Sequence, residues 1–234
     1  MKPLVWIVAY GERDIKDATA TTEALRHLYP DVPVVVHDNS SDNVGYCRAV
    51  SIGIEQMLSG GHDILWILSP DATPRQGALE GAAHRMAVSP ACGIVGSLQL
   101  DPEDPDLVRH GGTIIAYPAG VHVCGKLSEG IGTYPSMQKW VNSASMFIRR
   151  QCAQEIGGFD PDLFLFYGES DYCYRARLAG WEVWYEPRSA VTHRLSTSKN
   201  AVETVERDRA VFAAKWLGHP LWRLLDTISA PIPR

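Results

Sequence analysis

The chain has 234 residues, of which 45% are hydrophobic and 21% charged. This length and apolar fraction predict one folded domain and exclude an intrinsically disordered chain. The 22 basic and 27 acidic residues give a net charge of −5, which excludes the broad positive field that binding of a nucleic-acid polymer requires. Because no apolar run approaches the roughly 20 residues of a membrane span, and the start is not typical of a signal peptide, we expect a cytoplasmic protein. Five scattered cysteines without a CxxC pair are expected to be reduced core thiols.

The first hundred residues alternate between apolar runs and amphipathic stretches. The runs at 4–8, 32–37, 64–68 and 93–98 are rich in aliphatic residues and predict strands buried on both faces. The stretches at 17–28, 44–58 and 76–88 predict helices. This alternation indicates βαβ units and a mostly parallel sheet, which binds ligands at the carboxyl ends of its strands.

Residues after about 100 lack this regular alternation, and their pattern predicts a mixed α+β half. It contains a hairpin candidate at 111–123, strand candidates at 140–148, 181–185 and 190–193, and helix candidates at 169–179 and 203–217. We therefore interpret 1–234 as a single domain. Residues 1–100 form its first half, 101–217 its second half, and 218–234 a C-terminal extension.

A polar cluster, residues 38–45, follows the second predicted strand. Asp, Asn and Ser are typical of a turn and of a helix N-cap, so local structure alone can explain the cluster. The alternative is that Asp38, the first polar residue after the strand, accepts a hydrogen bond from the imide N–H of uracil or thymine.

Asp71 follows the third predicted strand. Because Thr73 and Pro74 already suit the N-cap and first turn of the next helix, Asp71 is not needed there. A carboxylate at the end of a strand suits a hard divalent cation bound to a diphosphate. Alternatively, Asp71 only fixes the turn. His193 ends the last predicted strand and suits either a structural hydrogen bond or a metal site.

Two carboxylates, Glu169 and Asp171, begin the helix predicted at 169–179. Both complement the helix dipole, and Asp171 can pair with Arg175 one turn later. Glu169, however, follows the apolar and aromatic run 163–167, where burial can raise the pKa of a carboxyl group. A carboxylate with a raised pKa is a serviceable general base.

Taken together, these segments resemble the inverting family-2 glycosyltransferases with the GT-A fold, especially their rhamnosyltransferase-like bacterial members. The resemblance covers roughly residues 4–217 and is most specific at 157–181 with His193. It implies an α/β, GT-A-like fold with a mostly parallel, Rossmann-type nucleotide-binding sheet and a mixed α+β acceptor half. It also implies sugar transfer from a nucleoside-diphosphate sugar to an acceptor hydroxyl, in bacterial glycan or glycoconjugate biosynthesis.

The same resemblance assigns site residues. Those implied to contact a UDP-, dTDP- or GDP-linked donor are Tyr10, Asp38, Asn43, Gly45, Arg48, Asp71 and Arg194. Those implied to contact the acceptor are Trp140 and Asn142, although Trp140 equally suits core packing. Asp71 and His193 are implied to hold Mn²⁺ or Mg²⁺, and Glu169, with Asp171 as the other candidate, to act as the base.

Three residues depart from the family pattern. Ser69 stands where another acidic or amide residue is common, Gly168 where the family has the first residue of an acidic pair, and Ser51 where Asn is frequent. The alternative function is therefore a non-catalytic nucleotide-sugar or carbohydrate-binding protein. A nucleotidyltransferase is disfavoured because Gly11 is the only glycine of the loop after the first strand. Residues 217–228 suit packing on the domain or on a second copy, with peripheral membrane contact as the alternative.

Overall fold

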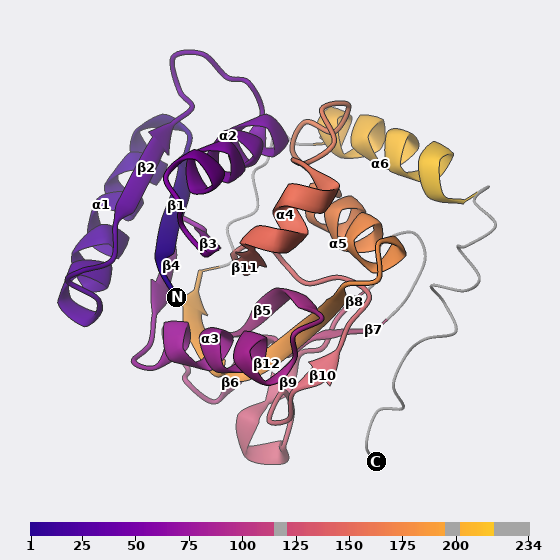
Figure 1. The fold of residues 1–234 in the computed structure, drawn as a ribbon. Helices are drawn as coiled ribbons and strands as arrows, with labels where there is room; N and C mark the ends of the chain where they lie inside the picture. The colour runs from indigo at the N-terminus through magenta and orange to yellow at the C-terminus, as the bar shows by residue number, and fades with distance from the viewer. Residues whose placement is uncertain (115–120, 195–201, 218–234) are drawn as a thin grey trace.

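The computed structural model describes residues 1–114, 121–194 and 202–217, in which a sheet of ten strands has helices on both faces (Figure 1). The helices are α1 (Gly11–Leu28), α2 (Tyr46–Ser59), α3 (Ala78–Val88), α4 (Arg150–Ile156), α5 (Gly168–Leu178) and α6 (Val202–Trp216), with a 3-10 turn at Leu127–Glu129. The sheet strands are β1 (Pro3–Ala9), β2 (Val34–Asp38), β3 (Ile64–Leu68), β4 (Ala72–Pro74), β5 (Cys92–Leu100), β6 (Leu107–His110), β9 (Gly125–Lys126), β10 (Ser136–Met137), β11 (Ser145–Arg149) and β12 (Glu182–His193).

The main path of the sheet runs β10-β12-β5-β11-β3-β1-β2. β1 pairs in parallel with β2 and β3, and β12 pairs in parallel with β5. β11 lies antiparallel between β3 and β5, which makes the sheet mixed. The expected α/β fold, with a mostly parallel sheet and a mixed second half, is confirmed.

Alternate residues of the central strands bury opposite faces, as the pleat requires. On β1, Leu4, Trp6 and Val8 belong to a core closed by α2, α4, α5 and α6. The intervening Val5 and Ile7 belong to a second core closed by α1 and α3. Both faces of β1 and β3 are therefore dry, as predicted for 4–8 and 64–68.

The second strand differs from its prediction. β2 pairs only with β1 and forms an edge of the sheet, and Val35 and Val36 are each 38% exposed. An aliphatic run does not distinguish an edge strand from a central one, since strand order depends on distant pairing.

The expected helix cap at Thr73 and Pro74 is wrong. Both residues lie in β4, where Thr73 pairs with Thr192 of β12. Helix α3 begins four residues after Pro74 and follows Gly77, whose φ of 86° is a left-handed conformation that suits glycine. Asp71 still serves no helix cap, although the reason is strand pairing.

Several boundaries also moved. The strand expected at 140–148 begins only at Ser145, and the strands expected at 181–185 and 190–193 are one strand, β12, with an irregularity between Glu186 and Ala190. Helix α1 begins at Gly11, six residues before the predicted start, and α4 was not predicted. The hairpin expected at 111–123 pairs β7 (Thr113–Ile114) with β8 (Val121–His122), and its tip lies outside the described residues.

All five cysteines are free thiols, as expected, and four are buried: Cys47, Cys92, Cys152 and Cys173. Cys124 is exposed, so the expectation that all five lie in the core is wrong for this residue. Across the part of the chain that the structure describes, none of the helices has the length and apolar character needed to cross a bilayer.

Candidate active site

The loop after β2 lies beside the start of α1, because β1 and β2 end side by side with Ala9 opposite Asp38. Asp38 is exposed, and its Oδ1 accepts the backbone N–H of Ser40 at 2.9 Å. The hydrogen bonds from Ser40 hold the pKa of Asp38 below its ordinary value. Ser40 Oγ in turn accepts the N–H of Gly11 at 2.8 Å. The turn interpretation is thus observed, and it leaves Asp38 as an ionised carboxylate at the surface.

Asn43 and Gly45 shape the end of this loop. Asn43 Oδ1 accepts the N–H of Gly45 and the side-chain amide of Asn39, both at 3.1 Å. Gly45 has φ 82°, and a Cβ there would approach the ring of Phe164 to 2.6 Å. Only glycine lets this loop pack against Phe164, so both residues have a structural role whether or not they contact a nucleotide.

Tyr10 and Arg48 have exposed side chains. Tyr10 follows β1, is 57% exposed, and its backbone N–H donates to Asp14. Arg48 pairs with Glu55 at 2.7 Å along the surface of α2. Neither side chain is needed for the core, so both are free to meet a ligand.

Asp71 and His193 meet where β3 and β12 end. His193 Nε2 lies 3.2 Å from Asp71 Oδ1, and the two side chains are 12% and 10% exposed. Ser69 Oγ donates to the same carboxylate oxygen at 2.6 Å. Burial acts to raise the pKa of Asp71, but the contacts of its carboxylate with His193 and Ser69 outweigh burial and hold the pKa below its ordinary value.

A chain of hydrogen bonds assigns the tautomer of His193. Asn142 Oδ1 accepts the backbone N–H of Ala144 at 2.8 Å and the side-chain amide of Gln99 at 3.1 Å. The remaining oxygen of Gln99, Oε1, lies 3.0 Å from His193 Nδ1 and must accept, so Nδ1 carries the hydrogen. Neutral His193 therefore has its lone pair on Nε2, facing the Asp71 carboxylate.

This arrangement fits a divalent cation. A lone pair facing a carboxylate oxygen is unfavourable unless a proton or a cation joins them, and a metal-binding imidazole is commonly oriented by an acceptor at its other nitrogen. The described residues contain no group of three or more His, Cys, Asp or Glu side chains that could hold a metal ion. Asp71 and His193 would supply two protein ligands to such a cation, and substrate oxygens and water would fill the other positions.

Arg194 follows His193 and is exposed. Its backbone N–H lies 3.5 Å from the carbonyl oxygen of Asp71, and it lines an open hollow with Asp71 and Asp17 of α1. The guanidinium thus belongs to the neighbourhood of the candidate metal ligands. Residues 195–201, which follow Arg194, and residues 218–234 lie outside the described residues.

Glu169 is the second residue of α5 and lies in apolar surroundings. Burial raises its pKa to about 7, and the described residues offer its carboxylate no basic partner; its own backbone N–H is the one group that lowers the pKa. Tyr167, directly before the helix, has φ 63°, a left-handed conformation that no other non-glycine residue of the described chain adopts. At Gly168 a Cβ would lie 2.4 Å from the sulfur of Cys47, so this glycine lets α5 approach α2. The predicted raised pKa of Glu169 agrees with this environment.

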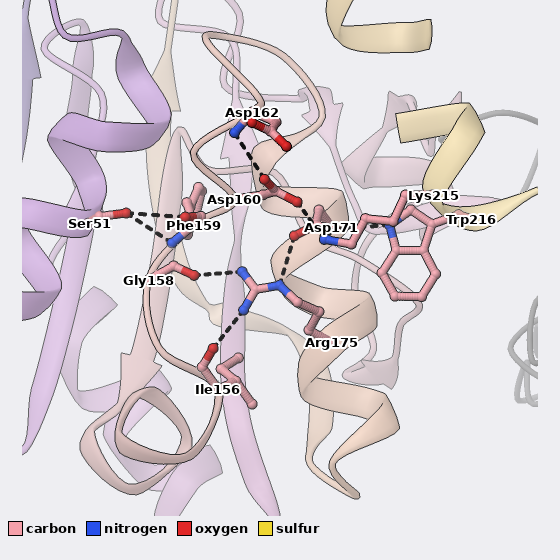
Figure 2. A network of polar contacts seen from close by, with 10 residues as sticks. All are labelled: Ser51, Ile156, Gly158, Phe159, Asp160, Asp162, Asp171, Arg175, Lys215 and Trp216. Atoms are coloured by element: carbon pink, nitrogen blue, oxygen red, sulfur yellow. Dashed lines mark hydrogen bonds and ion pairs between the residues drawn. The ribbon is translucent and has the colours of Figure 1, made fainter. Parts of the chain in front are cut away.

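Asp171 has the opposite environment, shown in Figure 2. It is fully buried, and its Oδ2 accepts Nε of Arg175 at 2.8 Å, the predicted pair. Its Oδ1 accepts Trp216 Nε1 at 3.0 Å and lies 2.6 Å from Lys215 Nζ. Its carboxylate therefore joins α5 to α6.

Figure 2 also shows how the 157–160 segment is held against α2. Ser51 Oγ accepts the N–H of Phe159 at 3.0 Å, and Arg175 donates to the carbonyl oxygens of Ile156 and Gly158. A Cβ at Gly158 would lie 2.7 Å from Ser51 Oγ. Ser51, a departure from the family pattern, thus has a packing role.

Trp140 is 4% exposed, belongs to the core, and meets the ring of His122 edge-on. Its position fits the core-packing alternative. Asn142 supports His193 through Gln99, a role that sequence reasoning missed. A polar residue within the apolar run of β5 is the signal that could have found Gln99.

The two parts of the site lie on either side of the loop before β11. Ala144 O accepts the N–H of Ser69, next to Asp71, at 2.8 Å. One residue earlier, Ser143 O lies 3.5 Å from the hydroxyl of Tyr46, whose pKa burial and the charge of Glu169 raise. The loop therefore connects the candidate metal ligands with the candidate base.

The family profile described as "Glycosyltransferase like family 2" matches residues 3–213. The chain belongs to this family. This chain is 24% identical, over 198 residues, to the N-acetylglucosaminyl-diphospho-decaprenol L-rhamnosyltransferase of two Mycobacterium tuberculosis strains. The alignment covers 76% of this chain and 64% of that protein, so the chain spans less than two thirds of the length of these curated relatives.

Solved structures agree on the fold. GalNAc-T7 with UDP, GalNAc and Mn²⁺ superposes with a TM-score of 0.64 at 14% identity, covering 94% of this chain and 48% of that one. The mannosyltransferase PcManGT of Pyrobaculum calidifontis, in complex with GDP-Man and Mn²⁺, gives 0.62 at 13% identity, covering 96% and 68%. A197 from STIV gives 0.54 at 14% identity, covering 84% and 87%. The GT-A-like fold and the family expected from the sequence are confirmed.

Proposed function

We propose that this family member transfers a sugar, with inversion, from a nucleoside-diphosphate sugar to an acceptor hydroxyl, and that Glu169 is the general base. The main supporting observation is the partly buried Glu169 carboxylate, with a pKa of about 7 and no basic partner among the described residues. A group that titrates near neutral pH is half ionised where the enzyme works and can still take a proton effectively. Asp171, held by Arg175 and Lys215, lacks that freedom.

In the proposed reaction Glu169 accepts the proton of the acceptor hydroxyl. The hydroxyl oxygen forms a bond to the anomeric carbon while the bond from that carbon to the diphosphate oxygen breaks, and the electron pair leaves with the nucleoside diphosphate. Attack from the face opposite the leaving group inverts the anomeric centre. Arg194, exposed beside Asp71, supplies positive charge near the leaving group.

Asp71 and His193 are the residues proposed to hold Mn²⁺ or Mg²⁺ together with diphosphate oxygens. When bound, the cation neutralises charge that develops on the leaving group. The nitrogen ligand favours Mn²⁺ over Mg²⁺. The Mn²⁺ in the structures of GalNAc-T7 and PcManGT supports this part of the proposal.

Asp38 is proposed to recognise the base of the donor, and the exposed side chains of Tyr10 and Arg48 are proposed to contact the donor as well. The similar structures GalNAc-T7 and PcManGT contain UDP and GDP-Man, and uracil and guanine both carry an imide-type N–H that a carboxylate accepts. The name of the M. tuberculosis relative supports a deoxyhexose as the sugar and a lipid-linked sugar diphosphate as the acceptor.

Donor turnover tests the proposal. A panel of nucleotide sugars with Mn²⁺ is screened by thermal shift, because a donor that binds the folded protein raises Tm. The stabilising donor is then incubated with candidate acceptors and with water alone, and release of nucleoside diphosphate is followed. Release that Glu169→Gln abolishes is the expected result. Binding without release by the wild-type protein contradicts the proposal and favours the non-catalytic alternative.

A further inference from the structure

Asp208 lies in α6 and is fully buried. Its carboxylate accepts three consecutive backbone N–H groups, those of Phe164 at 3.2 Å, Leu165 at 2.8 Å and Phe166 at 2.9 Å. Hydrogen bonds from N–H groups to an ionised carboxylate are stronger than neutral ones, and a buried carboxylate that loses them is costly. One side chain of α6 therefore fixes the conformation of residues 164–166, more than 40 positions earlier in the chain.

Residues 164–166 contact the start of α2 and lead into α5, the helix that carries Glu169. On the α2 side, the carbonyl oxygen of Phe164 accepts the N–H of Cys47 at 3.2 Å, and its ring packs where Gly45 has no side chain. On the α5 side, the segment leads into Tyr167 with its left-handed φ of 63°. The ring of Tyr167 stacks on Phe212 of α6, with centroids 5.3 Å apart. Helix α6 thus holds residues 164–166 through the carboxylate of Asp208, and Tyr167 through the ring of Phe212.

The titratable groups whose pKa values the charge of Glu169 affects are uncharged at neutral pH. They are the phenols of Tyr46 and Tyr167 and the thiols of Cys47 and Cys173, and burial raises the pKa of each. Glu169 therefore interacts with neutral titratable groups, one of which, Tyr167, directly follows the segment bound to Asp208. Release of this segment would admit water beside Glu169.

We propose that Asp208 is a positioning residue, which holds residues 164–166 in the conformation that shelters Glu169 and sets its direction. The proposal rests on the proposed function insofar as Glu169 is the base. Its structural part, control of the surroundings of Glu169 from α6, is independent of catalysis. Asp208 has no part in binding the donor at Asp38 or Asp71.

The test compares Asp208→Asn with Lys215→Gln. Asp208→Asn keeps the shape but replaces one accepting oxygen with an NH₂ group that cannot accept an N–H. Lys215→Gln is the matched control, because it removes α6 contacts to Asp160 and Asp171 without touching residues 164–166. For the wild-type protein and each variant, the titration of the Glu169 carboxyl carbon is followed by ¹³C NMR and assigned with Glu169→Gln. Tm, kcat and donor KM are measured in parallel.

For Asp208→Asn we expect the Glu169 midpoint to fall from about 7 toward its ordinary value by about one pH unit or more. The kcat value should fall about 10- to 100-fold with donor KM nearly unchanged, as for a misplaced reacting group. Lys215→Gln should lower Tm and leave the midpoint in place. An unmoved midpoint in folded Asp208→Asn overturns the proposal, as does an equal shift in Lys215→Gln.

If Asp208→Asn does not fold, Asp208→Glu is used, because it keeps the charge but displaces the accepting oxygens by one methylene. A lowered midpoint in this variant supports the proposal, and a wild-type midpoint contradicts it. The proposed function fails separately, if Glu169→Gln keeps normal turnover. In that case the NMR midpoints still decide whether Asp208 controls the surroundings of Glu169.

Discussion

Glu169 and Asp171 lie two residues apart at the start of α5 and have opposite electrostatic surroundings. Asp171 is fixed by Arg175, Lys215 and Trp216, whereas no cationic side chain of the described residues pairs with Glu169. Successive positions on a helix point in different directions, so one carboxylate faces α6 while the other faces α2. This difference separates a structural carboxylate, Asp171, from Glu169, the proposed base.

Asp171→Asn should destabilise the protein. Removing one member of a buried ion pair leaves the guanidinium of Arg175 and the ammonium of Lys215 without their carboxylate, at a cost of about 3 to 5 kcal/mol. Chemical denaturation measures the change. The matched control is Glu206→Gln, which breaks an exposed pair with Arg209 and should change stability by less than about 1 kcal/mol. Equal effects of the two variants would contradict a structural role for Asp171.

Glu169→Gln should stabilise the protein at high pH. The folded-state pKa of about 7 lies above the ordinary 4.5, so the folded protein binds more protons than the unfolded chain between these values. Stability from this group is complete below pH 4.5 and is lost as pH rises through 7. Gln mimics the protonated acid, so the variant should gain about 1 to 3 kcal/mol above pH 7 and little below pH 4.5. Tm measured from pH 4 to 8 checks this, and a gain that does not change with pH rules out the raised pKa.

Removal of the metal should weaken nucleotide binding through Asp71 and His193. Asp71→Asn and His193→Ala should lower the affinity for a nucleoside diphosphate about 10-fold or more with Mn²⁺ present, and change it little in EDTA. Calorimetric titration with and without Mn²⁺ measures the difference. Full turnover in EDTA would remove the metal from the mechanism and leave Asp71 as a turn residue.

Gln99→Leu should weaken Mn²⁺ binding without removing either candidate metal ligand. The substitution removes the acceptor of His193 Nδ1–H, so His193 loses the hydrogen bond that directs Nε2 to Asp71. Loss of such a supporting contact lowers metal affinity about 10- to 100-fold. Mn²⁺ titration of the nucleotide-bound protein checks this. Gln99→Glu, which keeps an acceptor oxygen, is the control and should bind Mn²⁺ more tightly than Gln99→Leu.

Asp38 should favour bases with an imide-type N–H. Uracil, thymine and guanine carry one, and adenine and cytosine do not, so UDP should bind about tenfold or more tightly than ADP. Asp38→Asn should reduce this preference, because its amide can turn either a donor or an acceptor toward the base. Calorimetry with UDP and ADP decides the assignment, and equal affinities for the wild-type protein would rule it out.

Local patterns predicted part of the fold and of the site. The runs at 4–8 and 64–68 became central strands because each is apolar at every position, and the aromatic run at 163–167 correctly indicated a raised pKa for Glu169. These features depend on near neighbours in the chain. The order of the motifs along the chain predicted the family, which composition alone does not reveal.

Features that depend on distant pairing were missed. Thr73 has the sequence of a helix cap but pairs with β12, about 120 residues later. The support of His193 by Gln99 arises because β5 and β12 are neighbours in the sheet. Asp208 acts on residues 42 to 44 positions earlier. The local sequence signal is the spacing of Asp208, which lies four residues before Phe212 and therefore on the same, apolar face of the helix. The structure shows that both side chains are buried.

The pH dependence of turnover by the wild-type protein and by Glu169→Gln tests the central claim most directly. For the wild-type protein, kcat should rise with pH through about 7 as Glu169 loses its proton. Glu169→Gln should lower kcat about 100-fold or more, leave donor affinity nearly unchanged and abolish this rise. Near-normal turnover by Glu169→Gln, together with a folded but inactive Asp171→Asn, would contradict the account and assign the base to Asp171.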